Sequence, residues 1–105
     1  MLTRLEKKLV KNRYFTVIND EHKFIEVKSN NTGHIWMIFR KALESNRPVV
    51  LYHKHTMDEW YHEQYRSWTV EDAVKEIKRH DAYVVRHPDY MRRKKLERYY
   101  ARQQY

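Results

Sequence analysis

The chain has 105 residues, of which 41% are hydrophobic and 34% charged, with a formal net charge of +8 and no cysteine. This length is typical of a single domain, and the apolar fraction suffices for one core, which argues against an intrinsically disordered chain. The lack of cysteine excludes disulfides, a thiol nucleophile and cysteine-ligated zinc, and favours a reducing compartment. No apolar run approaches the roughly 18 residues of a transmembrane helix, so we expect a cytoplasmic protein with no membrane partner.

The positive charge is concentrated at the two ends of the sequence. Residues 1–13 contain five cations and one carboxylate, and residues 86–105 contain seven cations and two carboxylates. The segment between them is close to neutral. Solubility alone does not require such segregation, whereas a cluster of one sign raises the local concentration of polyanions.

The first half of the chain predicts a short helix followed by strands. Thr3-Arg4-Leu5-Glu6 is a capping box, and the apolar residues after it recur at helical spacing, which predicts a helix over residues 4–11. From Tyr14 the apolar period changes to two, and the β-rich runs are 14–18, 24–28, 34–40 and 49–55. Because polar turns separate these runs, we expect an antiparallel meander of about four strands.

The segment 56–68 is compatible with a helix and with an extended strand. Thr56 opens a second capping box, but the aromatic and acidic residues that follow also alternate as they would in a strand. Its aromatic residues are Trp60, Tyr61, Tyr65 and Trp68. We expect them to cover the open sheet face, with stacking on nucleic-acid bases as the alternative, and we expect Trp68 to pack against Ala73.

The segment 69–81 gives the clearest helical pattern. Thr69 is the N-cap, and the apolar stripe consists of Val70, Ala73, Val74 and Ile77. This stripe is expected to pack on one sheet face against Trp36, Ile38 and Leu51. Residues 83–85 are a candidate edge strand, and Pro88 marks a boundary. The predicted organisation is therefore an α+β domain over residues 1–87 and a basic C-terminal helix or arm over residues 88–105.

The histidines form the one constellation with metal-binding spacing. His53 and His55 leave the same face of the predicted fourth strand, where two imidazoles can share a divalent ion. Candidates for completing the ligand set are Asp58, Glu59, His62 and His80. Since a chain with seven histidines produces such pairs by chance, the favoured interpretation is partly exposed histidines at a strand end, with no metal and no cofactor.

Sequence motifs for catalysis are lacking. A chain with one glycine holds neither a P-loop nor a dinucleotide fingerprint, since both need several glycines where the backbone approaches phosphates. The three serines lie in polar stretches without the context of a nucleophile elbow. We therefore expect a protein that is not an enzyme.

The C-terminal segment gives the strongest functional signal because it interleaves cations with tyrosines. Cations neutralise phosphates, and tyrosines stack on exposed bases. The candidate nucleic-acid-binding residues are Lys7, Lys8, Lys11, Arg92, Arg93, Lys94, Lys95, Arg98, Tyr99, Tyr100 and Arg102. The expected function is a small accessory protein that binds DNA or RNA mainly through phosphates. The alternative is a protein–protein interaction module, an inhibitor or adaptor, whose basic tail binds an acidic partner.

Overall fold

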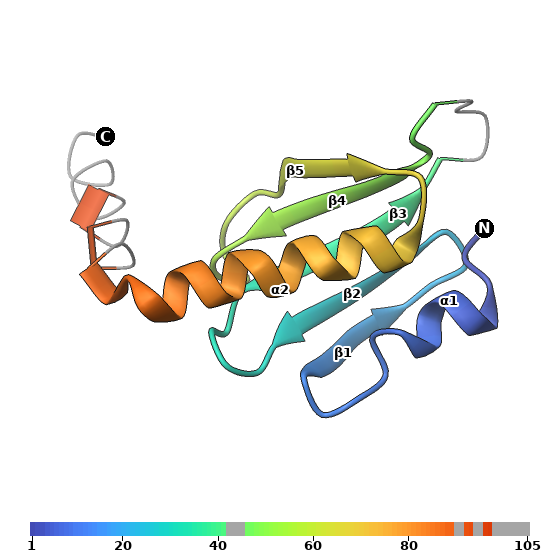
Figure 1. Cartoon of the computed structure of the whole chain (residues 1–105). Coiled ribbons are helices and arrows are strands. Elements are labelled where there is room, and N and C mark those ends of the chain that lie inside the picture. Colours follow the sequence, from blue (N-terminus) through green and yellow to red (C-terminus); the bar gives the residue numbers. More distant parts are fainter. Residues whose placement is uncertain (42–45, 90–91, 94–95, 98–105) are drawn as a thin grey trace.

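The computed structural model describes residues 1–41, 46–89, 92–93 and 96–97 (Figure 1). Its elements are α1 (Arg4–Lys8), β1 (Phe15–Asp20), β2 (Phe24–Ser29), β3 (Ile35–Arg40), β4 (Val49–Lys54), β5 (His62–Ser67) and α2 (Val70–Arg86). The strands form one antiparallel sheet in sequence order, and α2 runs across one face of it. The expected α+β fold is confirmed, with five strands in place of about four. Neither described helix combines the length and the apolar character needed to cross a membrane.

The core lies between α2 and the central strands. The apolar stripe of α2 is buried as expected and joins one cluster with Trp36, Ile38 and Leu51 from β3 and β4. Trp36 is fully buried, and its indole Nε1 donates a hydrogen bond to Ser29 Oγ at 3.0 Å, so its one polar atom is satisfied. The N-terminal segment completes the cluster through Leu2, Val10 and Phe15.

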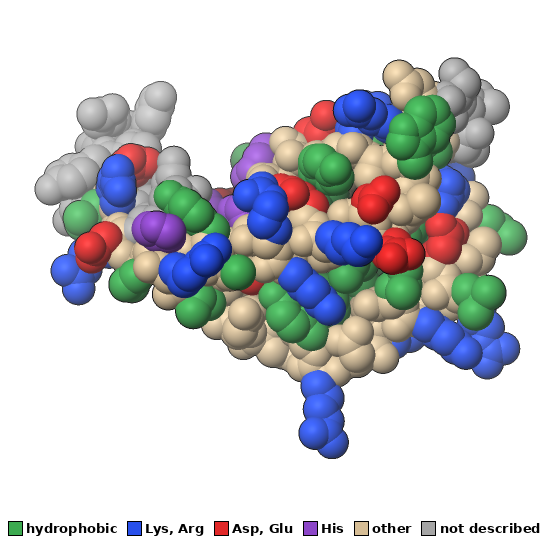
Figure 2. Space-filling model, in the orientation of Figure 1, with side chains coloured by type: hydrophobic (Ala, Val, Ile, Leu, Met, Phe, Trp, Pro, Cys, Tyr) green, Lys and Arg blue, Asp and Glu red, His purple; other side chains and the backbone are tan. Residues whose placement is uncertain are grey.

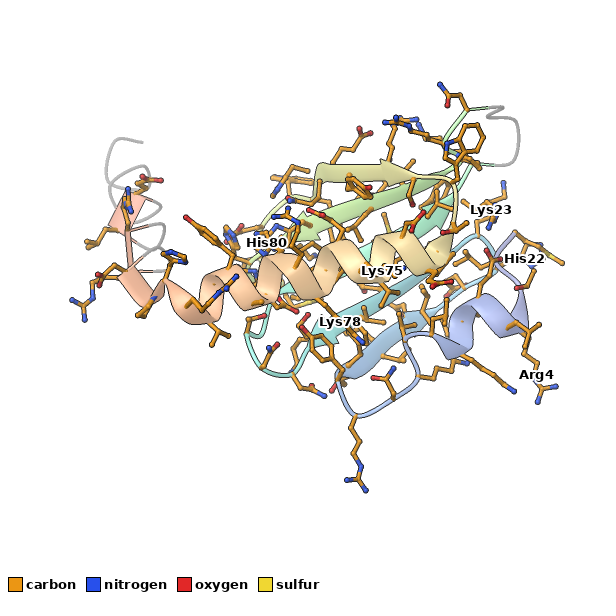
Figure 3. The ribbon with its side chains drawn as sticks, viewed as in Figure 1. Arg4, His22, Lys23, Lys75, Lys78 and His80 are labelled. Carbon is orange, nitrogen blue, oxygen red and sulfur yellow. The ribbon has the colours of Figure 1, made fainter. Side chains whose placement is uncertain are left out.

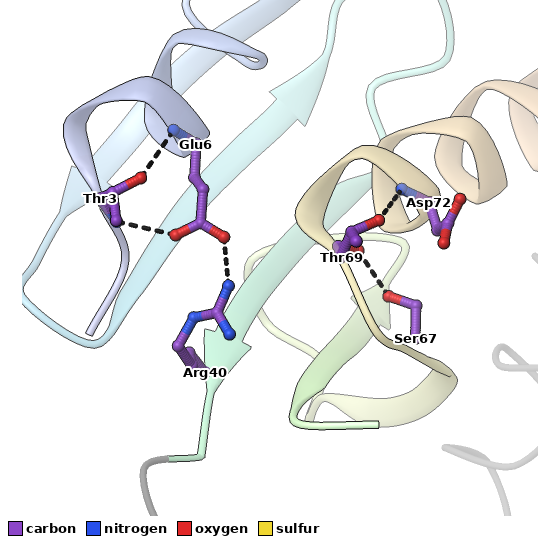
Figure 4. Close-up of polar contacts among 6 residues, drawn as sticks. All are labelled: Thr3, Glu6, Arg40, Ser67, Thr69 and Asp72. Carbon is purple, nitrogen blue, oxygen red and sulfur yellow. Dashed lines mark hydrogen bonds and ion pairs between the residues drawn. The ribbon is translucent and has the colours of Figure 1, made fainter. Parts of the chain in front are cut away.

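Both helices begin with the caps that the sequence predicts (Figure 4). Thr3 Oγ1 accepts a hydrogen bond from the Glu6 amide at 3.1 Å, and the Glu6 carboxylate accepts one from the Thr3 amide at 2.9 Å. Thr69 Oγ1 accepts from the Asp72 amide at 3.1 Å. Glu6 also forms an ion pair with Arg40 at the end of β3, which ties α1 to the sheet.

Two helix boundaries differ from the expected ones. The first helix ends at Lys8 and not at residue 11, because the Leu9 and Val10 amides bond to carbonyls three residues back and so tighten the chain into a turn. At the other end of the chain, α2 continues to Arg86 through the residues expected to form an edge strand. Asp81 and Val84 are buried, so the buried face of the helix extends for two turns beyond Ile77.

The ambiguous segment 56–68 is extended in its second half. Residues 62–67 form β5 and pair with β4, whereas the Thr56 capping box closes a single turn in which the Glu59 amide bonds to the Thr56 carbonyl. The expectation that the tryptophans cover the sheet is wrong, since the Trp60 side chain is 93% exposed and Trp68 is 57% exposed. The apolar face of the sheet is covered instead by α2 and the N-terminal segment.

Candidate metal centre

Histidines from several elements meet at one end of the sheet. In an antiparallel meander the start of β3, the end of β4 and the start of β5 lie at the same end, and the C-terminal half of α2 reaches it (Figure 1). His34 directly precedes β3, His53 lies near the end of β4 and His80 lies on α2. Figure 2 shows histidine side chains gathered beside α2 at this end of the body.

Three of these side chains converge closely enough to share one ion. One ligand nitrogen from each of His34, His53 and His80 lies within 4.8 Å of the other two. His34 Nδ1 and His53 Nε2 are 2.9 Å apart and share a hydrogen bond. Nitrogens at 2.0–2.1 Å from a tetrahedral zinc are about 3.4 Å from one another. Binding of one ion would therefore require the pair to separate by about 0.5 Å and the third nitrogen to approach by up to about 1.4 Å.

The third ligand has an unsatisfied atom. His80 Nδ1 is buried and has no hydrogen-bond partner among the described residues. Buried polar atoms are nearly always paired, so an orphaned imidazole nitrogen within this histidine cluster fits a missing partner such as a metal ion. Figure 3 shows His80 leaving α2 on the side of the strands that carry the other histidines.

Packing holds His53 in place and keeps it neutral. Its ring stacks on Trp36 with centroids 4.0 Å apart and an interplanar angle of 22°. Both His34 and His53 are only 1% exposed. Burial, reinforced by the neighbouring His80 and His34, lowers the pKa of His53 to about 2, and burial also lowers the pKa of His80. Neutral imidazole is the form that binds metals, so these two ligands are in the binding-competent state near neutral pH.

A buried carboxylate fixes the helix beside the cluster. Asp81, adjacent to His80, is fully buried and accepts hydrogen bonds from the Tyr14 hydroxyl at 2.6 Å and the Thr32 hydroxyl at 2.9 Å. Burial and the bond to Asp81 raise the pKa of Tyr14. Because Tyr14 precedes β1 and Thr32 lies in the turn before β3, these bonds set how α2 lies over the sheet and so where His80 points.

The cluster opens into a pocket of about 370 Å³. Its lining residues are His53, His55, His62, Gln64, Arg79, His80 and Tyr83. His55 Nδ1 lies 3.6 Å from the Glu59 carboxylate. Thus two of the three convergent histidines, His53 and His80, line this pocket together with His55 and His62.

Sequence reasoning identified part of this site. His53 and His55 share a face as expected, with ring centroids 4.9 Å apart, and His80 joins His53 as one of the weighed alternatives. The expectation that His53 is partly exposed is wrong, because Trp36 and α2 cover it. Sequence reasoning missed His34. Its signal is the strand register: Trp36 pairs with His53, so the residue two positions before Trp36 lies on the same face next to it.

The basic candidates do not form one surface. Lys7 and Lys11 both pair with Asp20, at 2.6 and 2.8 Å, and these ion pairs hold the pKa of Asp20 below its usual value. Lys8, also on α1, is exposed. Arg92 and Arg93 are exposed and lie at the opposite end of the molecule from α1 (Figure 1). The remaining candidates lie outside the described residues: Lys94, Lys95, Arg98, Tyr99, Tyr100 and Arg102.

Comparisons with known proteins do not identify the chain. No protein-family model matches it, and searches of curated proteins and of solved structures gave no significant match. The chemistry of the site is therefore argued from its donor atoms. Three imidazoles suit zinc, copper, nickel and cobalt, whereas magnesium and calcium prefer oxygen ligands.

Proposed function

We propose that the protein binds one divalent transition-metal ion through His34, His53 and His80. The observation that carries this proposal is the convergence of one imidazole nitrogen from each histidine within 4.8 Å of the others, in a cluster where the buried His80 Nδ1 has no hydrogen-bond partner among the described residues. A buried polar atom without a partner costs about 1–3 kcal/mol, and a bound ion removes that cost. Zinc is the ion we favour, because three histidines with a further position are a common zinc-binding set.

Metal entry requires a change of tautomer in the buried pair. One proton lies between His34 Nδ1 and His53 Nε2 in the hydrogen-bonded pair, and both nitrogens must be unprotonated to bind an ion. Each imidazole stays neutral if its proton is carried on the other ring nitrogen. Binding to neutral histidines therefore releases no proton from this pair, and affinity for the ion falls at low pH as the imidazoles become protonated.

The test is calorimetric titration of the full chain, without a polyhistidine tag, with Zn²⁺. We expect saturation at one ion per chain. His80→Gln should weaken binding by at least about tenfold, because the third nitrogen is lost. His22→Gln is the matched control, since His22 is exposed in the loop between β1 and β2, away from the cluster.

Circular dichroism establishes that each variant is folded before binding is compared. His80→Gln is the preferred variant because His80 makes no hydrogen bond through its buried nitrogen that the change would break. Equal zinc affinity in the wild type, His80→Gln and His22→Gln would refute the proposal. Failure of the folded wild type to take up zinc would refute it as well.

A second proposal concerns polyanions. The protein would act as an accessory factor, and not as an enzyme, that binds DNA or RNA through phosphates. Two observations support this: residues 86–105 contain seven cations, and Arg92 and Arg93 are exposed. In the N-terminal segment the support is weaker, because two of the three candidate lysines, Lys7 and Lys11, are already paired with Asp20. An acidic protein is the alternative partner for the same segment.

The salt dependence of binding tests this second proposal. If about five cations contact phosphates, log K should fall with log salt with a slope of roughly −4 to −5 on duplex DNA. Deletion of residues 88–105 should flatten the slope and leave α2 intact, since that helix ends at Arg86. If the truncated chain binds DNA as tightly as the full chain, residues 88–105 do not contribute to DNA binding. If the full chain binds an acidic protein tightly and does not bind DNA, an acidic protein is the partner of this segment.

A further inference from the structure

The three convergent histidines leave one side of the metal position open to the pocket. His53 and His80 line both the convergence point and the pocket, whereas His34 lies behind them and is buried. A zinc ion with three protein ligands keeps a fourth position for a molecule from outside. The pocket, at about 370 Å³, is far larger than the roughly 30 Å³ that one water occupies in the liquid. It therefore has room for a ligand of several atoms.

The charge at this position favours an anion. Three neutral imidazoles leave the two positive charges of the ion uncompensated, and the pocket wall holds the guanidinium of Arg79, whose own charge is balanced by Glu76. Arg79 is paired with Glu76, at 2.9 Å from Nε and 2.5 Å from Nη2. A guanidinium has five N–H donors, so this pair leaves further donors for a second acceptor. Asp81, the carboxylate next to His80, is already engaged by Tyr14 and Thr32.

We propose that the open position takes a phosphate group, with one oxygen on the metal ion and the others accepting hydrogen bonds from Arg79 and Gln64. This inference rests on the proposed metal site. Phosphate fits because it carries nearly two negative charges and several acceptor oxygens, and because guanidinium groups bind it through paired hydrogen bonds. The group can belong to free phosphate or to the phosphorylated end of a larger molecule, including the nucleic acid to which the chain's net charge of +8 is suited.

Cobalt(II) provides the probe, since its visible spectrum reports the number and type of its ligands. The full chain is loaded with one equivalent of Co²⁺ and then titrated with inorganic phosphate, with a small phosphomonoester, and with an oligonucleotide with or without a 5′ phosphate. We expect a saturable spectral change with phosphate. In Arg79→Gln, the phosphate affinity measured from this change should be about tenfold lower, which is the loss expected for one charge-assisted hydrogen bond. Lys75→Gln is the matched control, because Lys75 lies on the same helix, is exposed and pairs with Glu71 as Arg79 pairs with Glu76.

The outcomes separate this inference from the metal site itself. If the chain takes up one Co²⁺ ion but no phosphate compound alters the spectrum, the phosphate ligand is refuted and the proposed metal site is not. Failure to take up cobalt would refute both the metal site and the phosphate ligand. Equal phosphate affinity in Arg79→Gln and Lys75→Gln would also overturn the role of Arg79. A response to the 5′-phosphorylated oligonucleotide and not to its unphosphorylated form would identify a nucleic-acid end as the source, and a response to free phosphate alone would identify the small ion.

Discussion

Acid should destabilise the metal-free protein through His53. The pKa of this imidazole falls from an ordinary value of 6.5 in the unfolded chain to about 2 in the fold, because burial disfavours the charged form. A group with a lowered pKa of this kind contributes stability that is complete above the unfolded value and is lost as pH falls below it. His53 therefore stabilises the fold fully above about pH 6.5 and progressively less in more acidic solution.

The size of the effect follows from the two pKa values. At about pH 5 the unfolded chain is protonated at this position and the folded protein is not, which costs about 2 kcal/mol of unfolding free energy relative to neutral pH. This value is insensitive to the folded pKa as long as it stays below about 4. Urea unfolding in the presence of a chelator, at about pH 7.5 and about pH 5, measures the loss.

A variant isolates the contribution of His53. His53→Gln keeps a hydrogen-bonding group near the position of Nε2 and does not titrate, so its stability should fall by about 2 kcal/mol less than that of the wild type over the same pH range. His22→Gln, which removes an exposed histidine, should lose as much stability as the wild type. An identical pH dependence in the wild type and His53→Gln would refute the assignment of a buried, neutral imidazole.

Four further substitutions test how the side chains pack. Ile77→Ala should lower the unfolding free energy by about 2–4 kcal/mol in urea titrations, because Ile77 is fully buried, whereas Val85→Ala should change it little because Val85 is 58% exposed. Asp81→Asn should weaken the bonds from Tyr14 and Thr32, lower stability by about 1–3 kcal/mol and weaken zinc binding measured by calorimetry, since α2 would no longer be fixed beside the cluster. Trp60→Ala should leave the melting temperature nearly unchanged, since its side chain is 93% exposed.

The elements whose local pattern agrees with their packing were predictable from sequence. The stripe from Val70 to Ile77 follows a capping threonine and has one helical face, so its packing on the sheet follows from the residue pattern alone. The four strands from β1 to β4 lie between polar turns and carry β-forming residues. The residue pattern left the structure of the segment 56–68 undecided, because its aromatic residues suit a helix face and a strand equally well. Pairing with β4, a tertiary contact, decided the outcome.

The candidate site was only partly predictable because it depends on register. The spacing of His53 and His55 on one strand is visible in the sequence, but the approach of His34 depends on which residue of β3 lies opposite His53. His80 reaches the site because Asp81 fixes α2 through Tyr14 and Thr32, residues far away in the chain. The burial of His53 likewise depends on its contact with Trp36 in the neighbouring strand, and no local sequence pattern indicates that contact.

X-ray absorption at the zinc edge tests the metal site most directly. The full chain, without a tag and loaded with one equivalent of zinc, should give a first shell that contains three imidazole nitrogens at about 2.0–2.1 Å, with the multiple scattering characteristic of histidine rings. In His80→Gln the imidazole count should fall by one. A shell made of oxygen atoms alone, or an imidazole count unaltered in His80→Gln, would contradict the assignment of His34, His53 and His80 as the ligands.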